Sequence, residues 1–375
     1  MKFTFDKSAM VKEISIAQEI ISTKNSTSIL SNVLLIAQNN TLTLKVTDMK
    51  VNFETKIPVQ IEEEGSTIIY CDKFMGILNS LPDGEIEFKQ TSNGEENSIS
   101  VVIKPISKNI EFVMQSMTKE KYPEIFSAED TSYFEVSSKE IKSMISQTSF
   151  AVSEDETRYY LNGVLFEKKD NKLNMVATDG RRLSFASKEI LDGVNDFPSV
   201  IVHPKVLNII LKHAPEEGNI SIAIYEKMIF FKFGNYKFGS VLIDGKFPEY
   251  SRVIPESQKN LFIVQKNELV DALRRVVLMV DKKAGRLFFT ISEGVLKVSS
   301  SQSNLGSAEE EIPCEYAGEK YVIAMNNRYL EEPLKSVESE KVAFEFTDPS
   351  KLKAITMRPE PASDYFHIIM PMQPE

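Results

Sequence analysis

The sequence predicts an α+β protein made of three similar modules, each with two helices packed on antiparallel sheets. Phe3, Phe134 and Phe262 each open an apolar alternation typical of a strand, and an apolar pair at helical spacing follows five residues after it. The intervals of 131 and 128 residues are close to a third of the 375-residue chain. Self-similarity at a nearly constant spacing indicates equivalent structural units. We therefore expect three modules, spanning residues 1–122, 128–250 and 256–375.

A first helix is predicted after each of these openings. Met10, Ile14 and Ile21 recur at the spacing of a buried helical stripe, and Asp6 precedes them in a position to cap the helix. Residues 266–280 repeat the stripe in the third module. Because the pattern recurs, we expect an amphipathic helix at the start of every module.

Alternating apolar residues then predict half-buried strands. Residues 42–46 alternate before Thr47-Asp48, and residues 173–177 alternate before Thr178-Asp179, 131 positions later. Further alternation at 220–224 and 342–346 has the same period of two. Strands of this kind, interleaved with amphipathic helices, are typical of an α+β architecture.

A second helix in each module begins with a basic residue at the same place. Lys73, Lys205 and Arg328 each stand just inside the expected start of this helix. Similar connectors precede the second and third modules, since Lys121-Tyr-Pro-Glu-Ile125 and Lys246-Phe-Pro-Glu-Tyr250 lie 125 positions apart. Proline fixes φ and disfavours helix before it, which suits an extended connector.

Composition limits the class of protein. Cys71 and Cys314 fall in different modules without metal-ligand spacing, so we expect neither a disulfide framework nor a metal site, and no cofactor. The apolar runs are too short to span a bilayer, and the N-terminus does not resemble a signal peptide. These features predict a soluble, cytoplasmic protein. The net charge of −10 argues against a surface that binds nucleic acid all over.

The string Thr178-Asp-Gly-Arg-Arg182 is the most enzyme-like part of the sequence. Asp179 could bind a metal, and Arg181 and Arg182 a phosphate, as phosphoryl transfer requires. The alternative is a strand followed by a turn in which Asp-Gly supplies the positive φ. Both alternatives stay open at this point, together with a protein that only binds other proteins.

The expected helices are more basic than the rest of the chain. Their six segments sum to a charge of +3, although the whole chain carries −10. This distribution favours one mildly basic face formed by the helices, while the remaining surface is acidic. The basic residues concerned are Lys12, Lys73, Lys142, Lys205, Lys212, Arg274, Arg275, Arg328 and Lys335.

Four motifs make the chain similar to a known family. Arg158-Tyr-Tyr-Leu-Asn-Gly163 resembles RYYLNG, Ala177-Thr-Asp-Gly-Arg-Arg-Leu183 resembles ATDGHRL, and Asp244-Gly-Lys-Phe-Pro-Glu-Tyr250 resembles DGRFPDY. Ile369-Met-Pro-Met372 is similar to a closing VMPM. These strings, in this order along the whole chain, resemble the β sliding clamps of bacterial replicative DNA polymerases.

The resemblance implies a non-enzymatic processivity factor. In this family two subunits of three modules pair head to tail as a homodimer, and the ring encircles duplex DNA without reading its sequence. The resemblance implies that the DNA-facing residues are the nine helical cations given above together with Lys24 and Tyr159. It places Ile110 of one subunit against Leu278 and Met279 of the other.

The family's replicative polymerase and clamp loader, like its other partners, insert a short linear motif into a hydrophobic pocket. Two departures affect this pocket: Arg181 stands where the family has His, and Gln373-Pro-Glu375 replaces a terminal Arg-Leu. By resemblance the pocket comprises Leu161, Thr178, Gly180, Arg181, Arg182, Leu183, Pro248, Arg252, Val253, Ile368, Ile369, Met370, Pro371 and Met372.

Overall fold

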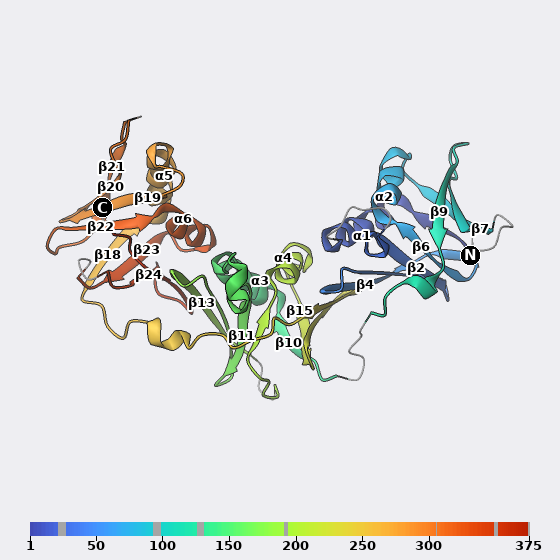
Figure 1. The fold of residues 1–375 in the computed structure, drawn as a ribbon, viewed down its shortest axis with the longest axis horizontal. Helices are drawn as coiled ribbons and strands as arrows, with labels where there is room; N and C mark the ends of the chain where they lie inside the picture. Colours follow the sequence, from blue (N-terminus) through green and yellow to red (C-terminus); the bar gives the residue numbers. More distant parts are fainter. Residues whose placement is uncertain are drawn as a thin grey trace. The chain divides into compact units, whose positions relative to one another are not determined.

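The computed structural model describes residues 1–21, 28–92, 99–125, 131–190, 194–304, 306–348 and 352–373. The chain forms two compact units (Figure 1). Unit 1 comprises Met1–Ser138 and Lys212–Leu242, and unit 2 comprises Lys139–Leu211 and Ile243–Glu375. Each unit is organised around one antiparallel sheet, which confirms the predicted α+β class.

The sheet of unit 1 runs in the order β10-β15-β16-β17-β4-β3-β2-β6-β9-β8-β7-β1-β5. Leu42, Leu44 and Val46 on β3 are fully buried, as their alternation predicts. The strands are β1 (Lys2–Asp6), β2 (Asn32–Gln38), β3 (Thr41–Thr47), β4 (Val51–Pro58), β5 (Gln60–Glu63), β6 (Gly65–Tyr70), β7 (Glu85–Ser92), β8 (Ile99–Pro105), β9 (Phe112–Met117), β10 (Phe134–Ser137), β15 (Asn219–Tyr225), β16 (Met228–Phe233) and β17 (Tyr236–Val241).

Two helices of unit 1, α1 (Lys7–Ile20) and α2 (Cys71–Ser80), lie side by side on this sheet (Figure 1). The Asp6 carboxylate accepts a hydrogen bond from the Ala9 amide at 3.0 Å, so the predicted cap is confirmed. Gln18 of α1 donates to Asp72 of α2 at 2.7 Å and ties the two helices together. Helix α1 ends at Ile20, one residue before the last apolar residue of its stripe, because Ile21 has an extended backbone.

The sheet of unit 2 runs in the order β14-β11-β12-β13-β25-β24-β23-β18-β21-β20-β19-β22. Its strands are β11 (Val164–Lys169), β12 (Lys172–Thr178), β13 (Arg182–Glu189), β14 (Val200–Val202), β18 (Asn260–Gln265), β19 (Arg286–Ser292), β20 (Val295–Ser300), β21 (Glu309–Glu315), β22 (Tyr321–Asn326), β23 (Lys341–Phe346), β24 (Ile355–Glu360) and β25 (Tyr365–Ile369). Two helices, α5 (Lys266–Val276) and α6 (Asn327–Ser336), pack against each other in this unit.

The apolar stripe of α5 is buried as predicted, although the helix is shorter than the stripe. Leu269, Leu273 and Val276 are fully buried, and the chain then tightens into a 3₁₀ turn over Val277–Met279. Two further helices belong to the middle third of the chain, α3 (Ser138–Thr148) and α4 (Pro204–His213). None of the helices in the described part of the chain has the length and apolar character needed to cross a bilayer.

The middle third of the chain gives strands to both sheets, and the two joining strand pairs are alike. In unit 1, β17 pairs antiparallel with β4, and Phe238 lies opposite Phe53. In unit 2, β13 pairs antiparallel with β25, and Phe185 lies opposite Phe366. In both pairs the rings stack at a centroid distance of 4.9 Å and an interplanar angle of 21°. The same kind of strand junction therefore occurs once in each sheet.

Candidate functional site

The string 178–182 forms the turn between β12 and β13. The Asp179 carboxylate accepts hydrogen bonds from the amides of Arg181 at 2.8 Å and Arg182 at 3.0 Å. The Thr178 hydroxyl donates to the Arg182 carbonyl at 2.6 Å and accepts from the Gly180 amide at 3.1 Å. Gly180 has φ +88°, a conformation that favours glycine. Asp179 therefore serves as the structural residue of a turn.

Arg182 is a buried cation that connects this turn to α6. Its side chain is 6% exposed, and its guanidinium binds Asp179 at 3.1 Å and forms an ion pair with Glu332. It also donates to the Phe150 carbonyl at 2.8 Å and lies over the Tyr329 ring at 4.8 Å. Since these contacts use its donors, Arg182 is not presented to an external phosphate.

The enzyme alternative would require a group of side chains able to hold a metal ion. Within the described ranges, no group of three or more His, Cys, Asp or Glu side chains is placed to hold a metal ion. Within the part of the chain that the structure describes, the hydrogen bonds of the Asp179 carboxylate go only to the amides of its own turn and to the Arg182 side chain. No specific observation favours the enzyme reading.

Several residues of the predicted pocket lie on one apolar cluster in unit 2. Leu161, Leu183 and Ile368 are at most 4% exposed and pack in this cluster. Phe247 and Phe366 also belong to the cluster but were not among the residues predicted for the pocket. Phe247 stands inside the motif at 244–250, and Phe366 shortly precedes the motif at 369–372. The fourteen residues predicted for the pocket are called the peptide surface below.

The peptide surface also includes large apolar side chains that face solvent. Val253 is 53% exposed and Met370 is 39% exposed. Thr178 and Ile369 are buried, whereas Gly180 and Pro248 are exposed. The arrangement therefore combines a rigid apolar base with adaptable exposed side chains.

The C-terminal residues of the peptide surface are held by backbone hydrogen bonds. The Met370 amide donates to the Arg181 carbonyl at 2.9 Å, and the Met372 amide donates to the Ala324 carbonyl at 2.8 Å. Pro371 and Met372 are partly buried. This segment thus runs from the β12–β13 turn to β22 and is not a frayed end.

A connector carries the remaining residues of the peptide surface. The 3₁₀ turn Tyr250–Val253 follows Pro248, and Tyr250 packs against the apolar cluster. The Tyr250 hydroxyl donates to Glu167 at 2.6 Å. Arg252 is 78% exposed and pairs with Glu249 at 2.5 Å. These contacts bring the connector to the same cluster as Leu183.

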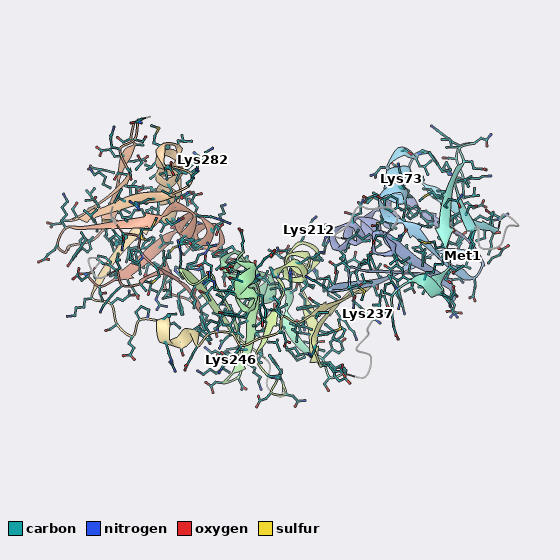
Figure 2. The ribbon with its side chains drawn as sticks, in the orientation of Figure 1. Met1, Lys73, Lys212, Lys237, Lys246 and Lys282 are labelled. Atoms are coloured by element: carbon teal, nitrogen blue, oxygen red, sulfur yellow. The ribbon has the colours of Figure 1, made fainter. Side chains whose placement is uncertain are left out.

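Predicted DNA-facing residues of unit 1 lie exposed on its helices. Lys12 on α1 has its ammonium 5.7 Å from the centre of the Tyr236 ring. Lys73 on α2 is exposed, and Lys212 at the end of α4 pairs with Glu19 at 2.5 Å (Figure 2). Lys24 lies outside the described residues.

Three predicted DNA-facing arginines of unit 2 are paired with carboxylates. Arg274 lies 3.4 Å from Asp271, and Arg275 binds both carboxylate oxygens of Glu310 at 2.5 and 2.7 Å. Arg328 binds Glu332 at 2.9 Å and Glu154 at 3.3 Å. These ion pairs reduce the positive charge that the basic residues present. Among the other predicted residues, Lys335 and Tyr159 are exposed, while Lys142 and Lys205 are partly buried.

β9 and β21 lie inside their sheets, and each leaves most of one edge unpaired in the described part of the chain. β9 pairs along its length with β8 but meets β6 only at Ser116 and Met117. β21 pairs along its length with β20 but meets β18 only at Cys314 and Glu315. Open edges offer backbone groups for pairing with another chain.

The predicted subunit-contact residues stand just before the start of β9 and after the end of α5. Ile110 lies two residues before β9 and is partly buried. A groove of about 740 Å³ between α2 and β9 is lined by Ile77, Phe112 and Met114. Leu278 is 82% exposed in the 3₁₀ turn after α5, next to the partly buried Met279.

These sheets with paired helices define a sliding-clamp fold. The sliding clamp (DNA polymerase III subunit beta) of Bartonella birtlesii, crystallised with griselimycin, matches with a TM-score of 0.91 and 30% identity, covering 100% of both chains. The sliding clamp of Pseudomonas aeruginosa, also crystallised with griselimycin, matches with a TM-score of 0.90 and 28% identity, covering 100% of this chain and 99% of that one. The beta sliding clamp of Treponema pallidum is 44% identical over 379 residues, covering 100% of both sequences.

Family models match nearly the whole chain. The N-terminal, central and C-terminal domains of the DNA polymerase III beta subunit match residues 1–126, 135–249 and 251–373. The chain belongs to the DNA polymerase III beta subunit family.

Proposed function

We propose that this protein is a DNA sliding clamp, a ring that encircles duplex DNA without sequence specificity and tethers the replicative polymerase and other partners. The observation that carries the proposal is the full-length match to the beta sliding clamp family, together with the repeated strand junctions. The clamp acts in the cytoplasm without catalysis, and its partners are duplex DNA, the polymerase, the clamp loader and a second copy of the chain.

The proposed modules are residues 1–122, 128–250 and 256–375. Three bridges at corresponding places support this division: Ile69 pairs with Ser116, Ile201 with Ile243, and Ala324 with Met372. The matched family domains have similar bounds. In this division β9, β17 and β25 are equivalent strands, and so are β4, β13 and β21.

This equivalence supports a head-to-tail ring. The pairs β4–β17 and β13–β25 form within the chain, whereas β21 and β9 keep open edges. A second copy supplies the missing partner, so β21 of one copy pairs with β9 of the other. Because the two surfaces differ, two such joints close a dimer of six modules.

Apolar side chains supplement this joint. Leu278 and Met279 of one copy meet Ile110 of the other, and Leu278 enters the groove lined by Phe112 and Met114. Burial of Leu278 would stabilise this joint. The side chain is 82% exposed in the single chain, and fully burying a leucine contributes about 1.5–3 kcal/mol of favourable free energy.

The helices of all modules form the DNA-facing lining. It comprises Lys12, Lys24, Lys73, Lys142, Tyr159, Lys205, Lys212, Arg274, Arg275, Arg328 and Lys335. Ion pairs such as Arg275 with Glu310 keep this lining weakly basic. Exposed ion pairs contribute only about 0–1 kcal/mol, so phosphates can compete for the cations. Weak, exchangeable phosphate contacts attract DNA but do not fix it in place.

Partners bind the peptide surface through a short linear motif. Its buried floor, with Leu161, Leu183 and Ile368, and its exposed Met370 and Val253 suit apolar side chains of different shapes. The surface joins a turn of the second module to the C-terminal strand of the third.

Topological retention on DNA tests the proposal. Loaded protein is expected to remain on nicked circular plasmid during gel filtration and to leave when the plasmid is linearised. Equal retention on linear DNA would contradict the ring. Absence of retention on either form, while polymerase still binds, would indicate a protein that only binds other proteins.

A further inference from the structure

Arg181 is the one cation of the β12–β13 turn that is left free to meet a partner. Its side chain is exposed and makes no hydrogen bond or ion pair with any residue in the described ranges. Arg182 in the same turn pairs with Asp179 and Glu332. Arg252 pairs with Glu249. A solvated guanidinium on a surface whose neighbouring arginines are neutralised is a local positive charge.

The backbone of Arg181 is fixed on both sides. Its amide donates to the Asp179 carboxylate at 2.8 Å, and its carbonyl accepts from the Met370 amide at 2.9 Å. The side chain therefore starts from a fixed point beside Met370, the 39% exposed apolar residue of the peptide surface. A segment that covers Met370 therefore lies beside the residue that carries the exposed guanidinium.

Nearby acidic groups do not cancel this charge. The carboxylate of Asp179 has 17% side-chain exposure and is bound to Arg182. Burial, and to a smaller extent the charge of Asp179, raises the pKa of the Tyr329 hydroxyl. The positive charge of Arg181 acts on this pKa in the opposite direction. The phenol thus stays neutral, and Arg181 remains the charged group at this edge of the peptide surface.

We propose that Arg181 makes the peptide surface select partner segments that carry a carboxylate beside their apolar side chains. This inference rests on the proposed peptide binding. Guanidinium and carboxylate form charge-assisted, often two-pronged hydrogen bonds. The chain as a whole carries −10 and repels an acidic segment at long range, but salt screens this repulsion beyond about 8 Å at physiological ionic strength. Selection therefore arises at contact.

A peptide occupant fits better than a nucleic-acid phosphate. Arg181 stands next to Met370, and Val253 on the same surface is also exposed. Exposed apolar side chains gain from covering by other apolar side chains and gain nothing from a phosphate backbone. The occupant is thus a segment with apolar side chains and one acid.

Paired peptides test the inference on the full-length protein. Each fluorescein-labelled octapeptide contains one Leu and one Phe at fixed positions. For every remaining position, one peptide carries Asp there and its partner peptide carries Asn. At the position facing Arg181, the Asp peptide is expected to bind about three- to tenfold more tightly than its Asn partner. Arg181→Gln should bring this ratio to about one, and Arg181→Lys should keep part of it.

The control and the contrary results are distinct. Lys282→Gln removes one exposed positive charge elsewhere on unit 2, and the ratio is expected to persist. Equal binding of Asp and Asn peptides at every position, or a ratio that survives Arg181→Gln, overturns the inference and leaves peptide binding intact. Binding of none of the peptides overturns the peptide surface itself. Loss of duplex DNA binding in Arg181→Gln, with the peptide ratio unchanged, assigns the residue to phosphate instead.

Discussion

Arg182 and Glu332 form an ion pair that joins β13 to α6 across 150 positions of the sequence. The guanidinium lies between the Phe150 and Tyr329 rings, at 5.5 and 4.8 Å from their centres, and also binds Asp179. The turn that carries part of the peptide surface is therefore fixed to α6. A change at this arginine should affect folding before it affects binding.

Arg182→Ala is expected to lower the free energy of unfolding by about 3 kcal/mol, because it leaves the largely buried Asp179 carboxylate without its cation and removes one of the two arginines that pair with Glu332. Urea unfolding followed by circular dichroism measures the change. Arg252→Ala is the matched control, since Arg252 is 78% exposed and its partner 61% exposed, and it should change stability by less than about 1 kcal/mol. Equal effects of the two variants would contradict the role of burial.

His367 predicts a dependence of stability on pH. Burial, aided by the positive charge of Arg182, lowers the pKa of His367 from 6.5 to about 3. The unfolded chain therefore binds a proton that the folded chain excludes. The resulting stability is fully present above pH 6.5 and is lost progressively as the pH falls toward 3. By pH 5.5 the loss is about 1.4 kcal/mol.

His367→Gln keeps an acceptor for the Ser184 hydroxyl, which lies 2.9 Å from the imidazole Nδ1. The stability of this variant should fall less than that of the original protein between pH 7.5 and 5.5. Urea midpoints at the two pH values provide the comparison. Parallel losses in both proteins would show that carboxylates alone govern this range.

The double change Leu278→Asp with Met279→Asp should yield folded single chains. Leu278 is 82% exposed within one chain, so charge is tolerated there, but the proposed joint buries it. Sedimentation equilibrium is expected to give the mass of one chain. Val241→Asp, at a residue that is 40% exposed in unit 1, should leave the dimer intact. An unchanged dimer in the double variant would refute this joint.

Glu310→Gln should make the protein hold DNA more tightly. The change frees Arg275, whose guanidinium otherwise binds both carboxylate oxygens. One additional phosphate contact is expected to steepen the dependence of retention on salt by about one unit of the logarithmic slope. Retention on circular DNA across a salt series measures it.

Glu309→Gln gives the same change in net charge and serves as the control. Glu309 pairs with Lys297, which is not among the predicted DNA-facing residues. If both substitutions steepen the slope equally, the effect comes from net charge and not from Arg275.

Met370→Ala with Met372→Ala should impair loading and polymerase docking while the ring stays closed. The backbone hydrogen bonds of both residues persist in alanine, so only the exposed and half-buried apolar surface is lost. Loading by the cognate loader and sedimentation are measured on the same preparation. A normal loading rate would argue against this part of the peptide surface.

Periodic burial was the part of the fold that the sequence encoded most directly. Leu42 and Leu44 alternate because one face of β3 packs inward, and this signal is local. Helix ends were less accurate, since apolar residues such as Val280 remain buried after the helix has ended at Val276. An apolar stripe shows which residues are buried. Residues that follow the end of a helix can be buried as well, so the stripe does not mark where the helix ends.

Ion pairs between distant segments could not be predicted from the sequence. Arg182 and Glu332, or Arg275 and Glu310, have no periodic signature, and only the fold brings them together. The charge count of the helices therefore overstated the cations available to DNA. The peptide surface came from motif resemblance, whereas the burial of Phe247 and Phe366 in one cluster with Leu183 depends on the packing of unit 2.

The like pairs β4–β17 and β13–β25 have a consequence for how the ring opens. Strands joined inside one chain meet at a high effective concentration because the backbone tethers them. In a closed dimer, each joint between copies is tethered in the same way by the opposite joint. Breaking one joint therefore leaves a linked, reclosable ring, and subunits separate only when both are broken. A slow exchange of subunits is thus compatible with frequent opening, and the two rates have to be measured separately.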